Sequence, residues 1–342
     1  MNTEPDYIEY EVAEKALLEI PDGPDRRKAR AAIHKKNCVV KYRAADKRSI
    51  EALRQGKLFF SSALGYNDPY DTLMYINYHG LNDSIGGNLW HFLPTYGEQQ
   101  PDKTAFNYLY SELYNGLPKE KKAQSIYNFL SHIREDAKAA IKELHDNVPG
   151  ICFAKDCLSP LMWAHYADKH RGFALLYDRK ELETAACFLE SGEQVLARRK
   201  LYDVEYRNER PDGTEFVEQY LLHQHLKETN TRYRFLHGSN PVDSPVQHSY
   251  SQTKLKEIIL TKSEEWSYEH ETRLLFRPVT IEKEWKKRYL DIKPRAIILG
   301  AKMNDEQKKD FTDIAGTLGS TLYEAWLDEQ TRDYNVVFQE VR

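Results

Sequence analysis

Short hydrophobic runs alternate with longer polar stretches along most of this chain. β-Branched and aromatic residues fill the runs, which predicts strands, while apolar residues three and four positions apart in the longer stretches predict helices. The predicted strands are 38–43, 58–61, 150–154, 172–177, 201–206, 271–277, 296–299, 322–326 and 336–340. The predicted helices are 25–36, 49–55 (with Ser49 as N-cap), 103–115, 119–145, 160–170, 215–235, 249–262 and 305–318.

The order of these elements indicates an α+β fold. Strands scattered among helices of irregular length fit a mixed or antiparallel sheet better than a doubly wound parallel sheet, in which the two alternate regularly. Residues 1–36 are polar and predict an N-terminal helical extension, whereas 37–342 predict a single α+β domain. Residues of about 72–149 predict loops and helices without a strand, which indicates a helical insertion in that domain.

Composition narrows the class of protein. With 342 residues, 41% of them hydrophobic and 30% charged, the chain can bury a sizeable core. A formal net charge of −4 argues against a protein that coats nucleic acid, although a local basic groove stays open. No apolar run approaches the ~20 residues that cross a bilayer, the acidic N-terminus does not resemble a signal peptide, and four cysteines are too few for a disulfide scaffold. We therefore expect a cytoplasmic protein with reduced thiols and no membrane partner.

Two early segments place polar side chains where a core would not need them. Arg43 ends the first strand beside Tyr42, so its guanidinium could grip a phosphate or carboxylate, or could simply pair with an acid at the strand end. The segment Asn67-Asp68-Pro69 predicts a tight turn. The flanking Tyr66 and Tyr70 could stack on a ring, and a purely structural turn explains the pattern equally well.

Two later segments carry further candidates. His165 and Tyr166 lie on the same side of the helix predicted over 160–170, so His165 could face a ligand or be a buried histidine, while Trp163 is predicted as a core residue. Glu269 and Glu271 would share one face of an extended segment. Neighbouring carboxylates split their proton affinities, which acid–base chemistry uses. The alternative is that Arg273 and Lys262 neutralise both carboxylates on a solvent-exposed face.

Other familiar chemistry has no motif here. Neither common phosphate-binding loop is present, nor is a nucleophile elbow or a His-Glu-x-x-His zinc motif. Cys152, Cys157, His165 and His170 follow one another in an order that zinc ligands can have, but without the close pairs of a structural zinc site. We predict no metal.

The segments together resemble the uncharacterised bacterial family known as domain of unknown function 2971. The resemblance rests on Lys41-Tyr42-Arg43, on Asn67-Asp68-Pro69-x-Asp71, on Met162-Trp-x-His-Tyr-Ala-x-x-His-x-Gly172, on Trp266-x-x-Glu-x-Glu-x-Arg273 and on Ile297-x-Leu-Gly300. These motifs occur in the order of the family, from about Val39 to the C-terminus. The family itself implies no reaction.

An early Arg, a following Ser with aromatic residues and a late Glu-x-Glu also resemble the arginine–serine–glutamate class of ADP-ribosyltransferases. That resemblance implies a split sheet and NAD as substrate, with a protein or nucleic-acid acceptor and a role in a bacterial toxin or phage-defence system. It implies that Arg43 grips the pyrophosphate or ribose, that Glu271 stabilises the oxocarbenium ion and that Glu269 activates the acceptor. It also implies that Ser61 or Ser62 supports the nicotinamide pocket and that Tyr66 or Tyr70 stacks on the ring. We further expect the other polar and aromatic motif residues to help bind the cofactor, namely Tyr42, Asn67, His165 and Tyr166.

Two other functions remain open from the residues alone. One is a non-catalytic module that binds a nucleotide or single-stranded RNA through aromatic and arginine side chains. The other is a metal-dependent nuclease that uses Asp68, Asp71, Glu269, Glu271 and His165. The NAD hypothesis makes a spatial prediction: Arg43, Tyr66 or Tyr70, and Glu271 converge on one cleft, and the hypothesis fails if Arg43 and Glu271 lie on opposite faces.

Overall fold

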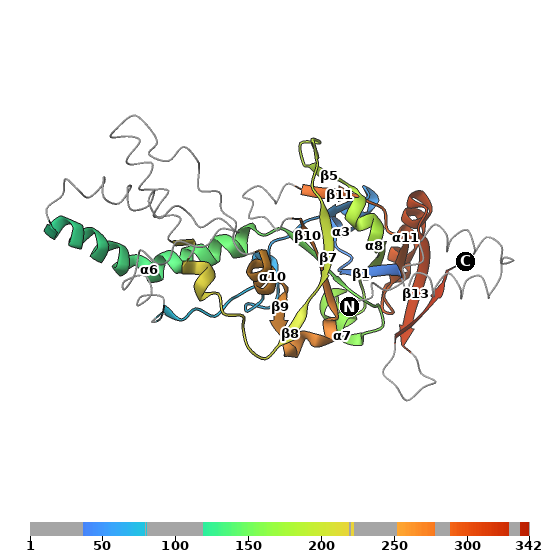
Figure 1. Cartoon of the computed structure of the whole chain (residues 1–342). Coiled ribbons are helices and arrows are strands. Elements are labelled where there is room, and N and C mark those ends of the chain that lie inside the picture. The colour runs from blue at the N-terminus through green and yellow to red at the C-terminus, as the bar shows by residue number, and fades with distance from the viewer. Residues whose placement is uncertain are drawn as a thin grey trace, which may run out of the picture. The chain divides into compact units, whose positions relative to one another are not determined.

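The computed structural model describes residues 37–78, 80, 119–218, 220–221, 252–277, 288–327 and 336–341 (Figure 1). The expected N-terminal extension, the helix predicted over 103–115 and most of the helix predicted over 215–235 lie outside these residues. The chain divides into two compact units. The first comprises Met1–Ser62, Pro149–Tyr206 and Glu264–Arg342, and the second comprises Ala63–Val148 and Arg207–Ser263.

A mixed eight-stranded sheet forms the centre of the first unit, in the order β14-β13-β12-β4-β1-β3-β10-β7. Its strands are β1 (Cys38–Arg43), β3 (Gly150–Ala154), β4 (Phe173–Asp178), β7 (Arg199–Asp203), β10 (Glu271–Phe276), β12 (Ala296–Leu299), β13 (Thr321–Leu327) and β14 (Val336–Glu340). Neighbouring strands are antiparallel, except that β12 and β13 are parallel and are joined through α11 (Asp305–Leu318). The α+β prediction is therefore confirmed.

A smaller sheet and several short helices complete the described part of this unit. The smaller sheet has the order β2-β11-β5-β6, with β2 (Lys57–Phe59), β11 (Arg288–Asp291), β5 (Ala186–Leu189) and β6 (Gln194–Val195). The helices are α3 (Lys47–Arg54), α7 (Pro160–Tyr166), α8 (Arg179–Thr184) and the 3-10 helix η2 (Glu264–Glu269).

Strand alternation gives the large sheet an apolar core on each face. On one face, Val39 and Leu175 belong to a cluster that includes Phe311 and Ile314 of α11. On the other face, Val40 belongs to a cluster with Trp163 and Met162 of α7. Strands β4 and β12 are buried at every position, which explains why their sequences read as continuous apolar runs.

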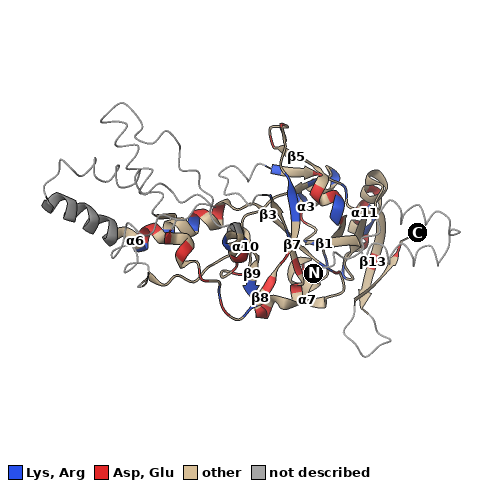
Figure 2. Cartoon of the chain, in the orientation of Figure 1, with Lys and Arg blue, Asp and Glu red and all other residues tan. Residues whose placement is uncertain are grey.

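The described residues of the second unit are mostly helical. They include η1 (Ala63–Gly65), α6 (Lys119–Asn147), α10 (Gln252–Leu260) and the short strand β9 (Thr261–Ser263), while β8 (Glu205–Arg207) crosses the unit boundary. Ile133, Ala137, Ala140 and Leu144 form a buried stripe on α6, as the helical spacing predicts. Figure 2 shows acidic and basic residues interspersed along the part of this helix that is drawn in colour. The unit includes most of the expected insertion at 72–149 and a second segment, 207–263, that the sequence did not suggest.

Several local expectations need correction. Asp46, and not Ser49, caps α3: the Oδ1 of Asp46 accepts a hydrogen bond of 2.8 Å from the Ser49 amide. The strand expected over 58–61 ends at Phe59. Helix α8 and strands β5, β6 and β11 were not predicted. Each is only two to six residues long, so each offers little periodicity to detect.

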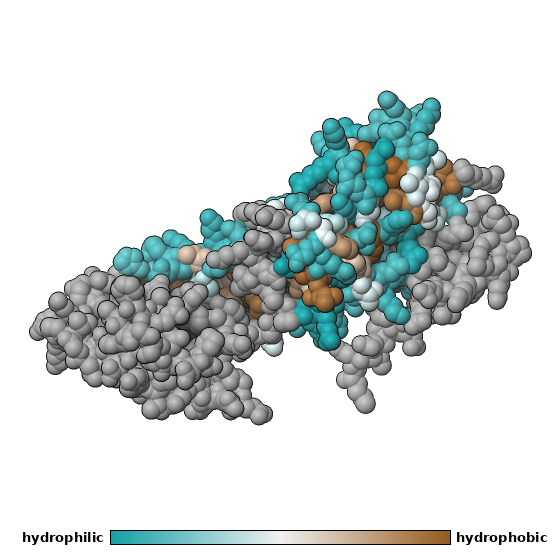
Figure 3. Space-filling view, turned by 90° about the horizontal axis from the view of Figure 1, so that it is seen from above, coloured by the Kyte–Doolittle hydropathy of each residue, from teal (hydrophilic) through white to brown (hydrophobic). Residues whose placement is uncertain are grey.

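The described surface is mostly hydrophilic on the face that Figure 3 shows. In the space-filling view of Figure 3, hydrophilic residues cover most of the described area and hydrophobic residues show in smaller areas between them. Within the described ranges, no helix has the length and apolar character needed to cross a bilayer.

Candidate functional site

Two of the sequence motifs meet in the first unit, where α7 contacts η2 (Figure 1). Ser159 caps α7 by accepting a hydrogen bond from the Met162 amide, and Pro160 occupies the first turn. Trp163 is completely buried, its Nε1 donates to the Cys157 carbonyl at 2.8 Å, and its ring meets Tyr42 edge-on at 5.2 Å. The prediction that Trp163 is a core residue is confirmed.

The chain leaves α7 through a left-handed turn. The helix, which was predicted to reach His170, ends at Tyr166. Asp168, Lys169 and His170 have φ values of 44°, 54° and 69°. The His170 ring stacks on Trp163 with centroids 6.3 Å apart, and burial together with nearby Lys302 lowers the pKa of His170. The turn holds His170 in place and leaves His165 on the exposed side of α7.

Glycines let the backbone pack closely beside this turn. A Cβ at Gly172 would lie 2.2 Å from the Arg43 carbonyl oxygen, and a Cβ at Gly300 would lie 2.3 Å from the His170 carbonyl oxygen. Neither contact is possible for a larger residue without moving the backbone. The His-x-Gly and Leu-Gly elements of the motifs are thus explained by packing.

Aromatic side chains gather around Glu269, the last residue of η2. Glu269 is 4% exposed, and its Oε1 accepts a hydrogen bond of 2.5 Å from the Tyr166 hydroxyl. The Tyr268 ring lies 6.0 Å from the Trp266 ring and 6.2 Å from the His165 ring. We call these five residues the Glu269 cluster. Of the predicted site residues, the structure brings His165, Tyr166 and Glu269 together here.

Glu271 has a different environment. His270, with φ of 43°, separates the end of η2 from the start of β10, so the expected extended segment with both glutamates on one face is wrong. Arg273 donates to both carboxylate oxygens of Glu271, at 2.7 and 3.0 Å, and Arg273 is 1% exposed and Glu271 5% exposed. Arg273 neutralises Glu271 as one alternative predicted, but within the protein and not at a solvent-exposed face.

Lys262 has an acidic partner within its own unit, and its role in neutralising the two glutamates stays a prediction. Its Nζ lies 3.5 Å from Asp71 Oδ2, in the second unit.

The thiol of Cys152 lies near Glu271. Burial is the main cause that raises the pKa of Cys152 to about 12, and the carboxylate of Glu271 adds to the effect. The thiol is therefore held protonated, as expected for a cysteine that packs as a small apolar side chain.

An acid–histidine pair lies next in sequence to the Glu269 cluster. His270 Nδ1 is 3.1 Å from Asp156 Oδ2, and the Lys155 amide donates to the His270 carbonyl. The Tyr42 hydroxyl donates to the Asp156 backbone carbonyl at 3.1 Å, so Tyr42 is a structural contact below this pair. Sequence reasoning missed Asp156 and His270, although His270 lies between the two glutamates that it singled out.

The strand register separates Arg43 from Glu271. Val40 pairs with Ala154, which pairs with Glu271, so these three side chains share the face that holds Trp163. Arg43 pairs with Phe173 and lies on the opposite face. Burial there lowers the pKa of Arg43. The predicted convergence of Arg43 and Glu271 on one cleft is therefore wrong.

Lys41 shares the Arg43 face and, like Arg43, is half-buried. Its Nζ donates to the Cys152 carbonyl at 2.6 Å and lies 5.8 Å from the Phe153 ring centroid. Burial, followed by the charge of Arg43, lowers the pKa of Lys41 to about 8. The Lys-Tyr-Arg strand thus supplies internal contacts of the sheet on both faces.

The predicted serines join two parts of the first unit. The Ser61 amide donates to the Gly150 carbonyl at 2.9 Å, and the Gly150 amide donates to the Ser61 carbonyl at 3.0 Å. The Ser61 hydroxyl also donates to the Gly150 carbonyl, at 3.3 Å, and Ser62 is buried. These bonds fix the backbone beside β3. A contact of either serine with a nicotinamide ring stays a prediction.

Tyr66, Asn67 and Tyr70 belong to the second unit. Asp68 Oδ1 accepts a hydrogen bond of 2.9 Å from the Tyr70 amide, which closes the turn predicted from Asn-Asp-Pro. Tyr70 is 63% exposed, with the Arg210 guanidinium 5.7 Å from its ring centroid. A stacking role for Tyr66 or Tyr70 stays a prediction. Within the described ranges, no three His, Cys, Asp or Glu side chains are placed to hold a metal ion.

The fold and site define an α+β protein in which the α7 turn and η2 build one surface site beside a mixed sheet. Residues 162–274 match the family model described as Protein of unknown function (DUF2971). The matched segment contains both motifs of the site, which confirms the family prediction over residues 162–274, while the predicted motifs at 41–43, 67–71 and 297–300 lie outside the match. No curated protein and no solved structure matches the chain, so the likeness to ADP-ribosyltransferases has no support from these comparisons.

Proposed function

We propose that the Glu269 cluster binds a nicotinamide nucleotide and that the protein consumes NAD. The observation that carries the proposal is a nearly buried carboxylate beside three exposed or half-buried aromatic and histidine rings. The nicotinamide ring of NAD is cationic. Aromatic faces attract cations, and a carboxylate shielded from water attracts them more strongly than an exposed one.

Each residue of the cluster has a role in this proposal. Trp266 and Tyr268 stack on the nicotinamide. The bond between ribose C1′ and the ring nitrogen breaks, the bonding electron pair leaves with the now neutral nicotinamide, and Glu269 stabilises the oxocarbenium ion. Tyr166 positions the carboxylate through its hydrogen bond. His165, the exposed base of the cluster, takes the proton of the acceptor that attacks C1′.

The NAD hypothesis in the form implied by the resemblance to ADP-ribosyltransferases fails, because Arg43 and Glu271 lie on opposite faces of the sheet, and the present proposal keeps only the nicotinamide chemistry, on other residues. Glu271 is replaced by Glu269, because Arg273 holds the Glu271 carboxylate inside the sheet. Arg43 has no part, because it lies on the opposite face of the sheet. A role in a toxin or phage-defence system, and the protein or nucleic-acid acceptor, stay predictions.

The test is release of nicotinamide from NAD by the purified full chain, with labelled NAD used to follow transfer to an acceptor. Glu269→Gln keeps the shape and an acceptor for Tyr166 but removes the charge, so we expect a loss of about 100-fold or more in rate. Glu265→Gln, an exposed position on the same 3-10 helix, is the matched control and should leave the rate unchanged.

Two results would contradict the proposal. Saturable binding of NAD without release of nicotinamide, in the presence of cell extract as a source of acceptors, would show that the protein is a binding module and that the enzymatic part of the proposal is wrong. Absence of both binding and release would remove the nicotinamide site altogether. Equal rates for wild type and Glu269→Gln would remove Glu269 from the chemistry.

A further inference from the structure

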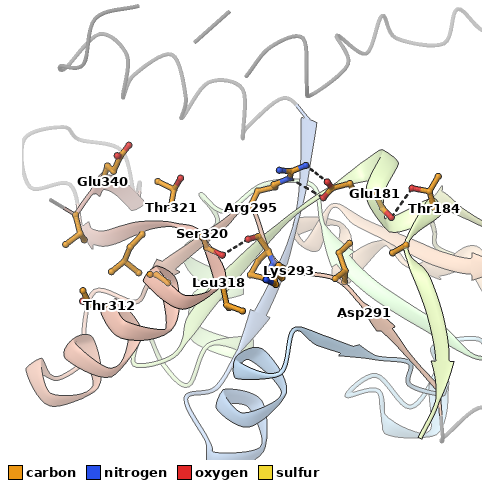
Figure 4. A pocket seen from close by; sticks show the side chains of 18 residues that line it. Glu181, Thr184, Asp291, Lys293, Arg295, Thr312, Leu318, Ser320, Thr321 and Glu340 are labelled. Carbon is orange, nitrogen blue, oxygen red and sulfur yellow. Dashed lines mark hydrogen bonds and ion pairs between the residues drawn. The ribbon is translucent and has the colours of Figure 1, made fainter. Parts of the chain in front are cut away.

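A cavity of about 950 Å³ lies in the first unit, away from the motifs discussed above (Figure 4). Its walls are the end of α8, the connection from β11 to β12, the C-terminal end of α11 and the neighbouring residues of β13 and β14. Its size is that of a pocket for a small molecule.

One pair of charges in this cavity is already satisfied. Arg295 donates through Nε to Glu181 at 3.1 Å and through Nη2 to the other carboxylate oxygen, and Figure 4 shows the two side chains turned toward each other. This bidentate arrangement fixes both groups. It leaves the charges on the β11–β12 connection as the ones that a ligand would meet.

Those charges are one acid and one base, two residues apart. Asp291 and Lys293 are both exposed and both line the cavity. Within the described part of the chain, neither side chain has an ion pair or hydrogen bond, and the two do not pair with each other. The wall therefore presents a carboxylate and an ammonium group side by side, each able to take a charge of the opposite sign.

The remaining wall is apolar, and at one point a helix backbone without a side chain faces the cavity. Ile292, Leu322 and Ala315 contribute buried apolar groups. Gly316 also lines the cavity, within α11, and a Cβ added there would meet no atom within 4 Å. Glycine weakens a helix relative to alanine. The packing of α11 thus gives no reason for glycine at this position, whereas contact between a ligand and the helix backbone would.

We infer that this cavity binds a zwitterion of the amino-acid or dipeptide class with an apolar side chain. Its ammonium group would meet Asp291, its carboxylate would meet Lys293, and its side chain would lie against Leu322 and the Gly316 backbone. A simple anion is disfavoured, because the carboxylates of Glu181, Asp291 and Glu340 outnumber the two cationic side chains of the wall. The inference is independent of the proposed nicotinamide site.

Calorimetric titration of the full chain tests this inference, with leucine and leucylglycine as probes. N-Acetylleucine amide, which lacks both charges, is the matched control ligand, and glutarate tests binding of a simple anion. We expect binding of one or both zwitterions at millimolar concentration and none of the two controls. Absence of binding by both zwitterions, or equal binding by the blocked analogue, would overturn the inference.

Variants then locate the site. Lys293→Glu should weaken zwitterion binding about tenfold, because an attraction is replaced by a repulsion. Lys309→Glu, an exposed position on α11 outside the cavity, should leave binding unchanged. Gly316→Ala should raise Tm by about 2 °C and yet weaken binding. A Gly316→Ala protein with raised Tm and unchanged affinity, or equal effects of the two lysine variants, would show that the ligand binds elsewhere.

Discussion

The charges of Glu271 and Arg273 lie two positions apart on β10, and almost no part of either side chain reaches water. Each charge would be very unfavourable there alone, because the protein interior cannot replace the hydration that it loses. The two hydrogen bonds between the side chains compensate for that loss only while both partners are present. The pair therefore makes the two residues depend on each other strongly.

Removing one partner should be far more damaging than removing both. We expect Arg273→Leu to lower the free energy of unfolding by about 3–5 kcal/mol, because it removes the guanidinium that donates two hydrogen bonds to the buried Glu271 carboxylate. The double variant Glu271→Leu with Arg273→Leu should lie much closer to the wild type. Denaturant unfolding of the three proteins measures both effects. A double variant as unstable as the single one would contradict the interpretation.

The same variant should respond to pH in a defined direction. Without Arg273, burial raises the folded-state pKa of Glu271 above its unfolded value, so the folded protein binds the extra proton. The deficit of Arg273→Leu relative to wild type should therefore shrink as the pH falls from about 7 to about 4.

Sequence reasoning succeeded for residues whose role depends on near neighbours. The turn at Asn67-Asp68-Pro69 and the pairing of Glu271 with Arg273 follow from local spacing, and both are present. Arg43 failed for a different reason. The face on which a strand residue lies depends on the register with the next strand, and one strand read alone does not contain that register.

At the scale of elements, the link from α7 to β4 combines strain with close packing. Three consecutive residues with positive φ are costly for side chains other than glycine. The contacts of Gly172 and Gly300 with the neighbouring backbone hold the link in this conformation. The link thereby sets the position of α7, and with it the position of Tyr166 and His165.

Two substitutions in this link should have opposite effects. Gly172→Ala should lower the free energy of unfolding by about 3 kcal/mol or more, because the added Cβ meets a backbone carbonyl that cannot move aside. Lys169→Gly should raise it by about 1 kcal/mol, because the exposed lysine adopts a backbone conformation that glycine tolerates. Denaturant unfolding measures both, and a destabilised Lys169→Gly protein would refute the interpretation of strain.

Elements were predictable where their pattern was long or entirely apolar. The sequence identified β1, β3, β12, β14 and α11 with the bounds that the structure has. It extended α7 to His170, because helix propensity does not reveal a left-handed turn that tertiary contacts impose. It also missed η2, since a single 3-10 turn has no period to detect.

At the scale of the whole molecule, the chain forms two compact units from alternating segments. The core residues of the first unit come from three separate stretches of sequence, so composition along the chain did not reveal the boundary after Tyr206. The segment 207–263 reads as helical and polar, and nothing in its own pattern assigns it to the unit that contains 63–148.

Two units with separate cores should unfold in two calorimetric transitions. Gly172→Ala changes the first unit and should lower the temperature of one transition. Leu255→Ala removes a buried side chain of the second unit and should lower the other, with a loss of about 2–5 kcal/mol in that unit. A single transition that both variants shift equally would show that the units unfold as one.

The paired bonds between Ser61 and Gly150 have a consequence for how this protein can vary. Ser61 and Gly150 are hydrogen-bonded neighbours, so the 88 residues between them form a loop whose two ends are held together within the first unit. The entropy of closing such a loop changes only slowly with its length. Related proteins could therefore have a longer, shorter or different segment in place of residues 62–149 while the sheet and the Glu269 cluster keep their geometry.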